Sequence, residues 1–262
     1  MTHRTIAPAA LLLSCLACEP AASTDAAATA AASAVTSAVS PVPAATASAE
    51  TKPKRKRKTL ADCEKTPTVE FENEHLEMVV RRQLRKPKGA IRHSELTRIK
   101  TLDLSQAKSN DDLDPCIFRH FTGVRGLYLA PGRLDDLTPI AKLVKLESLR
   151  ASATSVKDLS PLKNLKNLDR LDLGRTPVDD LSPIVGLVKL TALMLDRTEV
   201  SDLSPLRGMK LMEILNIKYT RVRDIEALAG MRKLKHLYIT GAPIKDTSPV
   251  MGMRKLQLHE DR

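Results

Sequence analysis

The stretch LKNLDRLDLGRTPVDDLSPIVG, from Leu165 to Gly186, decides the fold of this chain, because versions of it recur along the second half of the sequence. The first residue of each version stands 22 residues after the previous one. These first residues are Phe121, Leu143, Leu165, Leu187, Met209, Met231 and Met253. A fixed period in this range indicates a solenoid, in which each repeat buries its apolar face against its neighbours.

Each repeat is predicted to contain one short strand and one short turn of helix. Residues 171–173 alternate apolar and polar side chains, which is typical of a strand. The equivalent segments are 127–129, 149–151, 193–195, 215–217 and 237–239. Ser182 followed by Pro183 is typical of a helix start, and only one turn fits before the next repeat. We therefore expect an α/β solenoid with a parallel sheet on one face and 3₁₀ or one-turn helices on the other.

The repeat resembles the leucine-rich repeat family, in the 22-residue class typified by the bacterial internalins. The family pattern is L-x-x-L-x-L-x-x-N, and in this chain Thr replaces the Asn in four repeats while Gly or Ala replaces it in two. These residues are Thr154, Thr176, Thr198, Thr220, Gly132 and Ala242. The resemblance covers residues 69–258. It implies an arc with the strands on the concave face, and a function in binding rather than catalysis.

The first 18 residues have the pattern of a bacterial export signal, with Arg4 ahead of an apolar run from Ile6 to Leu13. The sequence from Leu12 to Cys15 resembles a lipobox, which predicts lipidation of Cys15; Cys18 is a poorer match. An ordinary signal peptide and an unprocessed apolar N-terminus are the alternatives. The resemblance implies a lipid-anchored protein of the cell envelope, in the outer membrane if the organism has one, or else a secreted protein.

Residues 19–60 are expected to be a disordered linker, because Ala, Ser, Thr and Pro dominate most of the segment and cannot build a core. The linker ends with a polybasic run from Lys52 to Lys58. This run is either a solvated stretch of charge or a contact with an anionic membrane surface.

Residues 61–120 are predicted to form a helical N-terminal cap and a first irregular repeat, ahead of the regular repeats in 121–262. Residues 72–86 have apolar side chains at helical spacing, with acidic residues early and basic residues late, which suits a helix dipole. The irregular repeat carries its strand at 102–104. Cys63 and Cys116 flank this region, and an oxidising envelope would favour a disulfide between them. Two free thiols are the alternative.

The charge of the chain is basic but spread out. The formal net charge is +11, and the repeats in 121–262 contain 24 basic and 17 acidic residues without a block of one sign. This pattern suits an acidic or mixed-charge partner and is too diffuse to indicate nucleic acid. The sequence has no catalytic, nucleotide-binding or metal-binding motif, so we expect neither enzyme activity nor a cofactor or metal ion.

The candidate binding residues lie on the expected concave face, on either side of the inward leucines. They are Tyr128, Arg150, Arg170, Asp172, Arg175, Asp196, Arg197, Lys218, Tyr219, His236 and Tyr238. The chain has only three tyrosines and no tryptophan, and all three tyrosines belong to this set. Since tyrosine and arginine often anchor interfaces, the set predicts a partner site. The alternative is an ordinary solvated sheet.

These observations lead to one functional expectation and two alternatives. We expect a non-enzymatic, lipid-anchored protein of the bacterial envelope that docks a protein or an acidic glycan on its concave face. An internalin-like adhesin that binds another cell is one alternative. A cytosolic regulator of an enzyme such as a phosphatase is the other, and it requires that the export signal is not used. The sequence gives no expectation about oligomeric state.

Overall fold

The computed structural model describes residues 57–64, 66–108 and 111–260. All of them belong to the second of two compact units in the chain, Pro53–Arg262. The expected signal peptide, Cys15 and the linker as far as residue 56 lie outside the described residues. So do Lys52 and its neighbours in the polybasic run, up to residue 56.

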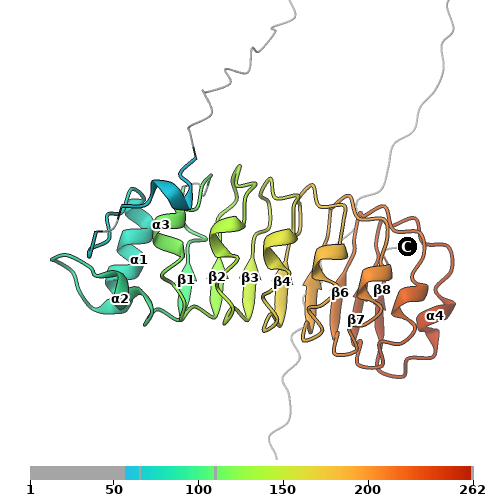
Figure 1. Ribbon diagram of the computed structural model, residues 1–262. Coiled ribbons are helices and arrows are strands. Elements are labelled where there is room, and N and C mark those ends of the chain that lie inside the picture. Colours follow the sequence, from blue (N-terminus) through green and yellow to red (C-terminus); the bar gives the residue numbers. More distant parts are fainter. Residues whose placement is uncertain (1–56, 65, 109–110, 261–262) are drawn as a thin grey trace, which may run out of the picture. The chain divides into compact units, whose positions relative to one another are not determined.

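The described unit is built on one parallel sheet of eight three-residue strands, which pair in the order of the chain (Figure 1). The strands are β1 (Thr101–Asp103), β2 (Gly126–Tyr128), β3 (Ser148–Arg150), β4 (Arg170–Asp172), β5 (Ala192–Met194), β6 (Ile214–Asn216), β7 (His236–Tyr238) and β8 (Gln257–His259). Each strand from β1 to β7 begins one residue earlier than the sequence predicts. The solenoid is confirmed, since every strand pairs only with the strands of the neighbouring repeats.

The middle residue of each strand from β1 to β7 is a buried leucine, and the register aligns these leucines from repeat to repeat. Leu149 pairs with Leu171 and Leu171 pairs with Leu193, and none of the three is more than 1% exposed. Because side chains alternate along a strand, the first and third residues of each strand point away from this core. We call the surface that they form the sheet face.

A short helical turn lies on the return leg of each repeat, as expected. Five regular repeats have 3₁₀ turns, which are η2 (Thr138–Ile140), η3 (Ser160–Leu162), η4 (Ser182–Ile184), η5 (Ser204–Leu206) and η6 (Glu226–Leu228). The first unit and the last have one-turn α-helices instead, α2 (His93–Leu96), α3 (Pro115–Phe118) and α4 (Ser248–Met251). The turn η6 begins without the Ser-Pro pair, so that pair favours the turn but is not required for it.

An aspartate two residues ahead of each turn supplies its cap. The Oδ1 atom of Asp180 accepts hydrogen bonds from the backbone N–H of Ser182 at 2.8 Å and from the Ser182 hydroxyl at 2.6 Å. The backbone bond recurs at Asp136, Asp158, Asp202, Asp224 and Asp246. These carboxylates satisfy donors that the first turn of a helix leaves unpaired.

The N-terminal cap consists of α1 (Glu74–Leu84), packed beside β1, and a 3₁₀ turn η1 (Leu60–Asp62) beside α3. The Asn73 side chain accepts from the backbone N–H of Leu76 at 2.9 Å and so starts α1. A disulfide joins Cys63 to Cys116, as the sequence predicts. The last two residues of the polybasic run are ion-paired to the folded unit, since Arg57 contacts Asp135 and Lys58 contacts Glu72 and Asp114.

The last repeat is one residue shorter than the others. Its buried position is filled by Leu258, which pairs with Leu237 at a separation of 21 residues instead of 22. A strict period would have placed His259 in the core and Leu258 outside. No strand was predicted after 237–239, so β8 is an additional element, whereas α4 is the expected turn of the repeat that begins at Met231.

Candidate functional site

The sheet face presents two columns of side chains, one from the first residue and one from the third residue of each strand. The first column is Thr101, Gly126, Ser148, Arg170, Ala192, Ile214, His236 and Gln257. The third-residue column is Asp103, Tyr128, Arg150, Asp172, Met194, Asn216, Tyr238 and His259. Neighbouring members of a column are about 4.8 Å apart, so the two columns form a continuous strip.

Charged side chains pair along the middle of the strip. The Nε atom of Arg150 lies 3.3 Å from an Asp172 carboxylate oxygen, directly across the register from β3 to β4. The Asp172 side chain also accepts from the backbone N–H of Gly174 at 3.1 Å. Arg170 pairs more loosely with Asp169, at 3.7 Å. These pairs hold the side chains upright beside one another without burying them, so they remain available to a partner.

The predicted residues Arg175, Arg197 and Tyr219 lie beside the strip, in the turn that follows each strand. All three have left-handed backbone conformations, with φ of 59°, 56° and 55°. The conformation turns each backbone N–H toward a carbonyl of the next repeat, at 2.7 to 2.8 Å, so the ladder of hydrogen bonds continues past the strands. Their side chains extend outward as a third row, and the Arg197 guanidinium lies 4.4 Å above the centre of the Tyr219 ring.

Aromatic residues gather at the C-terminal end of the strip. The Tyr238 ring stacks on the His259 ring, with centroids 4.1 Å apart and an angle of 12° between the planes. Nδ1 of His236 lies 3.4 Å from Nε2 of His259. Lys218 lies in the turn that follows β6, and its ammonium group is 5.5 Å from the centre of the Tyr238 ring. We call Lys218, Tyr238, His236 and His259 the aromatic cluster.

The structure thus brings together only part of the predicted set. His236, Tyr238 and Lys218 lie in the aromatic cluster, next to the pair of Arg197 and Tyr219. Tyr128 is on β2, five strands from β7, which is roughly 24 Å away at the usual strand spacing. The Asp196 carboxylate already has a partner in the next repeat, since it accepts a hydrogen bond from the Asn216 side-chain amide at 3.3 Å.

His259 is a member of the aromatic cluster that the sequence analysis did not include. The signal was present in the sequence, because Leu256 and Leu258 alternate in the manner of a strand. A strict 22-residue period places His259 at an inward position, because the last repeat is one residue shorter, and so the sequence pattern did not identify it as a surface residue.

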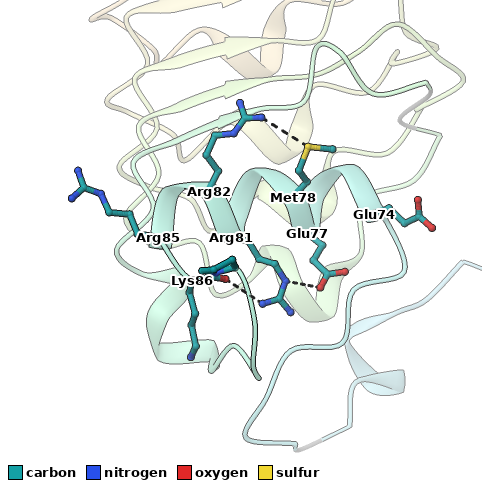
Figure 2. A pocket seen from close by; sticks show the side chains of 8 residues that line it. Glu74, Glu77, Met78, Arg81, Arg82, Arg85 and Lys86 are labelled. Carbon is teal, nitrogen blue, oxygen red and sulfur yellow. Dashed lines mark hydrogen bonds and ion pairs between the residues drawn. The ribbon is translucent and has the colours of Figure 1, made fainter.

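A hollow in the described part of the chain lies along α1 and not on the sheet face (Figure 2). Its lining is Glu74, Glu77, Met78, Arg81, Arg82, Arg85, Lys86 and Pro87. Several of the charges are already engaged, because Arg81 pairs with Glu77 at 2.8 Å and Lys86 pairs with Glu95 at 3.1 Å. Figure 2 shows these side chains spread along α1 and the residues that follow it, and the hollow is open rather than an enclosed chamber that could exclude water from a reaction.

Neither a candidate metal-ion site nor a candidate membrane-spanning helix occurs among the described residues. They contain no group of three or more His, Cys, Asp and Glu side chains placed to hold a metal ion. None of their helices is both long enough and apolar enough to cross a bilayer. What the geometry offers is a long, partly exposed strip with cationic and aromatic side chains, which is suited to binding an extended partner surface.

Solved structures share this architecture, although no family model and no curated protein sequence matches the chain. An internalin of Listeria monocytogenes, inlF, is 28% identical with a TM-score of 0.66, and the match covers 72% of this chain but only 56% of the internalin. Internalin C2 of the same species is 24% identical with a TM-score of 0.65, covering 73% of this chain and 94% of that one.

A leucine-rich-repeat protein of Leptospira interrogans is more distant, at 16% identity and a TM-score of 0.51, over 63% of this chain and 50% of its own. It supports the fold alone. The 22-residue period, the ordered parallel strands and the 3₁₀ turns agree with these likenesses. The chain is an internalin-like leucine-rich-repeat protein.

Proposed function

We propose that this protein is a non-enzymatic binding protein of the bacterial envelope, which docks a partner protein on its sheet face. The observation that carries the proposal is the run of cationic and aromatic side chains from Arg197 and Tyr219 into the aromatic cluster. Side chains of these types supply large contact areas at low entropic cost and are the usual anchors of interfaces. An acidic glycan is a second class of ligand that the same cations suit.

The proposed location is the extracytoplasmic side of the membrane, through a lipid on Cys15. The disulfide between Cys63 and Cys116 supports export, because such bonds persist in oxidising compartments. For the same reason it argues against a cytosolic regulator. Intact mass spectrometry of the protein from its native membranes tests the anchor. The expected species begins at an acylated Cys15, whereas a chain that keeps Met1 and free thiols would contradict both export and anchoring.

The likeness to the Listeria internalins favours one alternative, an adhesin that binds another cell. It would use the same sheet face and differ only in where the partner resides. Cell fractionation after cross-linking separates the two cases. A partner from the protein's own envelope supports the first proposal, and a partner found only on added host or neighbouring cells supports the adhesin.

The docking surface is tested by photo-cross-linking in cells that make the full chain with a photoreactive residue in place of Met194, on β5 in the sheet face. The double variant Arg175→Glu with Arg197→Glu should abolish the cross-linked adduct without changing the melting temperature. A matched control is Arg223→Glu with Lys245→Glu, which makes the same change in net charge on exposed residues away from the sheet face. An adduct that persists in the first variant would refute docking on the sheet face.

A further inference from the structure

The turns that lead into β3 to β8 form a second charged surface. Its members are far apart in the sequence and come together only in the folded solenoid. We call it the leading edge, and it consists of residues 141–147, 163–169, 185–191, 207–213, 229–235 and 251–256. Twelve exposed cations stand on it: Lys142, Lys145, Lys163, Lys166, Lys189, Arg207, Lys210, Arg232, Lys233, Lys235, Arg254 and Lys255. The same segments contain three acidic residues, Glu147, Asp169 and Glu213.

The turns that follow the strands have the opposite composition. This trailing edge, residues 131–136, 153–158, 175–180, 197–202, 219–224 and 241–246, carries nine acidic and seven basic residues. Six of its acids are the aspartates that cap the helical turns, so the fold itself requires them. No such requirement acts on the leading edge, and its cations therefore need a different explanation.

Most of the leading-edge cations have no acidic partner. Among the described residues, only Lys235 of the twelve is ion-paired, with Glu213 at 2.8 Å. On the trailing edge, Lys157 pairs with Asp179 at 2.8 Å and Arg221 pairs with Glu199 at 3.5 Å. The register stacks the leading-edge cations in rows, so that the side chains of Lys166 and Lys210 extend over Gly186 and Gly230 of the following repeats. Unpaired like charges held in rows make a strongly positive surface.

The leading edge is also where apolar side chains are exposed. Val144, Val185, Val188, Leu211 and Met251 lie on it, with exposures of 52%, 55%, 51%, 37% and 72%. Five of the eight large apolar side chains that are exposed in the described residues thus belong to this one edge. Val144 and Val188 occupy the same repeat position as Lys166 and Lys210, so apolar and cationic side chains alternate from repeat to repeat.

We propose that the leading edge is a contact surface for an anionic phospholipid bilayer. Lysines and arginines would bind the lipid phosphates, and the valines, Leu211 and Met251 would enter the boundary between headgroups and acyl chains. A soluble polyanion would need the cations alone and would gain nothing from the exposed apolar groups, which is why a membrane is the partner that both features fit. The sheet face is a different surface, so docking of a partner there and contact with lipid do not exclude each other.

The test uses the full chain with Cys15→Ser and Cys18→Ser, so that no acyl chain is attached, and vesicles of phosphatidylcholine with about one third phosphatidylglycerol. The readout is the difference between variants, because all of them keep the apolar run from Ile6 to Leu13. The variant Lys233→Glu with Lys255→Glu should raise the dissociation constant about tenfold or more. The matched variant Arg223→Glu with Lys245→Glu has the same net charge and should change it by less than about threefold. Comparing the two removes the contribution of the polybasic run, which both retain.

The variant Val185→Ser with Val188→Ser separates a membrane from a soluble polyanion. It should weaken binding to the vesicles and leave binding to heparin unchanged. Equal vesicle binding by the two charge variants would overturn the proposal. So would a loss of binding by Lys233→Glu with Lys255→Glu that is just as large on vesicles of phosphatidylcholine alone. If a leading-edge variant loses binding only to heparin or nucleic acid, the partner of this surface is a soluble polyanion and not a membrane. This test does not depend on the sheet face. The variant Arg175→Glu with Arg197→Glu should bind vesicles as the control Arg223→Glu with Lys245→Glu does.

Discussion

The threonine that replaces asparagine in four repeats acts within its own repeat. The Thr176 hydroxyl donates to the carbonyl of Leu173 at 2.7 Å, and the same bond recurs at Thr154, Thr198 and Thr220. The link to the next repeat comes from the backbone instead, since the N–H of Arg175 donates to the carbonyl of Asp196 at 2.7 Å. A short hydroxyl therefore suffices at a buried position, because its single O–H donor is satisfied by one carbonyl of its own repeat.

Gly123 is the residue whose replacement should be most damaging for its size. A Cβ atom at this position would lie 1.9 Å from the carbonyl oxygen of Thr97, and backbone cannot move aside as a flexible side chain can. We expect Gly123→Ala to lower the free energy of unfolding by at least about 2 kcal/mol, as overpacking does elsewhere.

Chemical denaturation measures this loss, and Gly208→Ala is the matched control. Nothing lies within 4 Å of a Cβ at Gly208, so that variant should stay within about 0.5 kcal/mol of the wild type. Equal stability of the two alanine variants would contradict the predicted clash.

At the scale of the element, two of the aspartates that cap the 3₁₀ turns, Asp158 and Asp202, should make the solenoid sensitive to acid. Hydrogen bonds from the side chain and backbone of Ser204 hold the pKa of Asp202 below its ordinary value of 3.8. Its contribution to stability is therefore fully present above that value and is lost as the pH falls through the lower folded pKa.

The variant Asp202→Asn should isolate this contribution. Asparagine is a good cap but does not titrate, so stability at neutral pH should fall by no more than about 0.5 kcal/mol. The loss of stability between pH 5 and pH 3 should become shallower than in the wild type. Denaturant titrations at several pH values measure both quantities, and an unchanged acid dependence would show that the Asp202 cap does not contribute to it.

The elements show which parts of this molecule its sequence predicts. Leucines at a fixed spacing identify β2 to β7, because burial against identical neighbours leaves little choice of side chain at those positions. The cap at Asp180 was not predicted, since the sequence shows the residue but not its hydrogen-bond partner. His259 was missed because one absent residue shifts the register of β8. The rows on the leading edge appear only after the chain is stacked, since their members are 20 or more residues apart.

At the scale of the whole molecule, stability should be graded along the solenoid, because each repeat contacts only its neighbours. The middle strands have fully buried leucines on both sides, whereas Leu256 and Leu258 at the C-terminal end are only partly buried. We expect the backbone amides of α4 and β8 to exchange with solvent first and those of β4 to β6 to exchange last. Hydrogen exchange followed by mass spectrometry measures this order.

Reduction of the disulfide gives the sharpest form of this prediction. The bond between Cys63 and Cys116 closes a separation of 53 residues, which on a chain-entropy model corresponds to roughly 4 kcal/mol. Because coupling runs from neighbour to neighbour, the loss should fall on the N-terminal end. Reduction should speed exchange in residues 57–64 and in α3 and leave β5 and β6 unchanged. Protection that fell equally in all eight strands would instead mean that the repeats unfold as one cooperative unit, and mutations at either end would then weaken the binding surface in the middle.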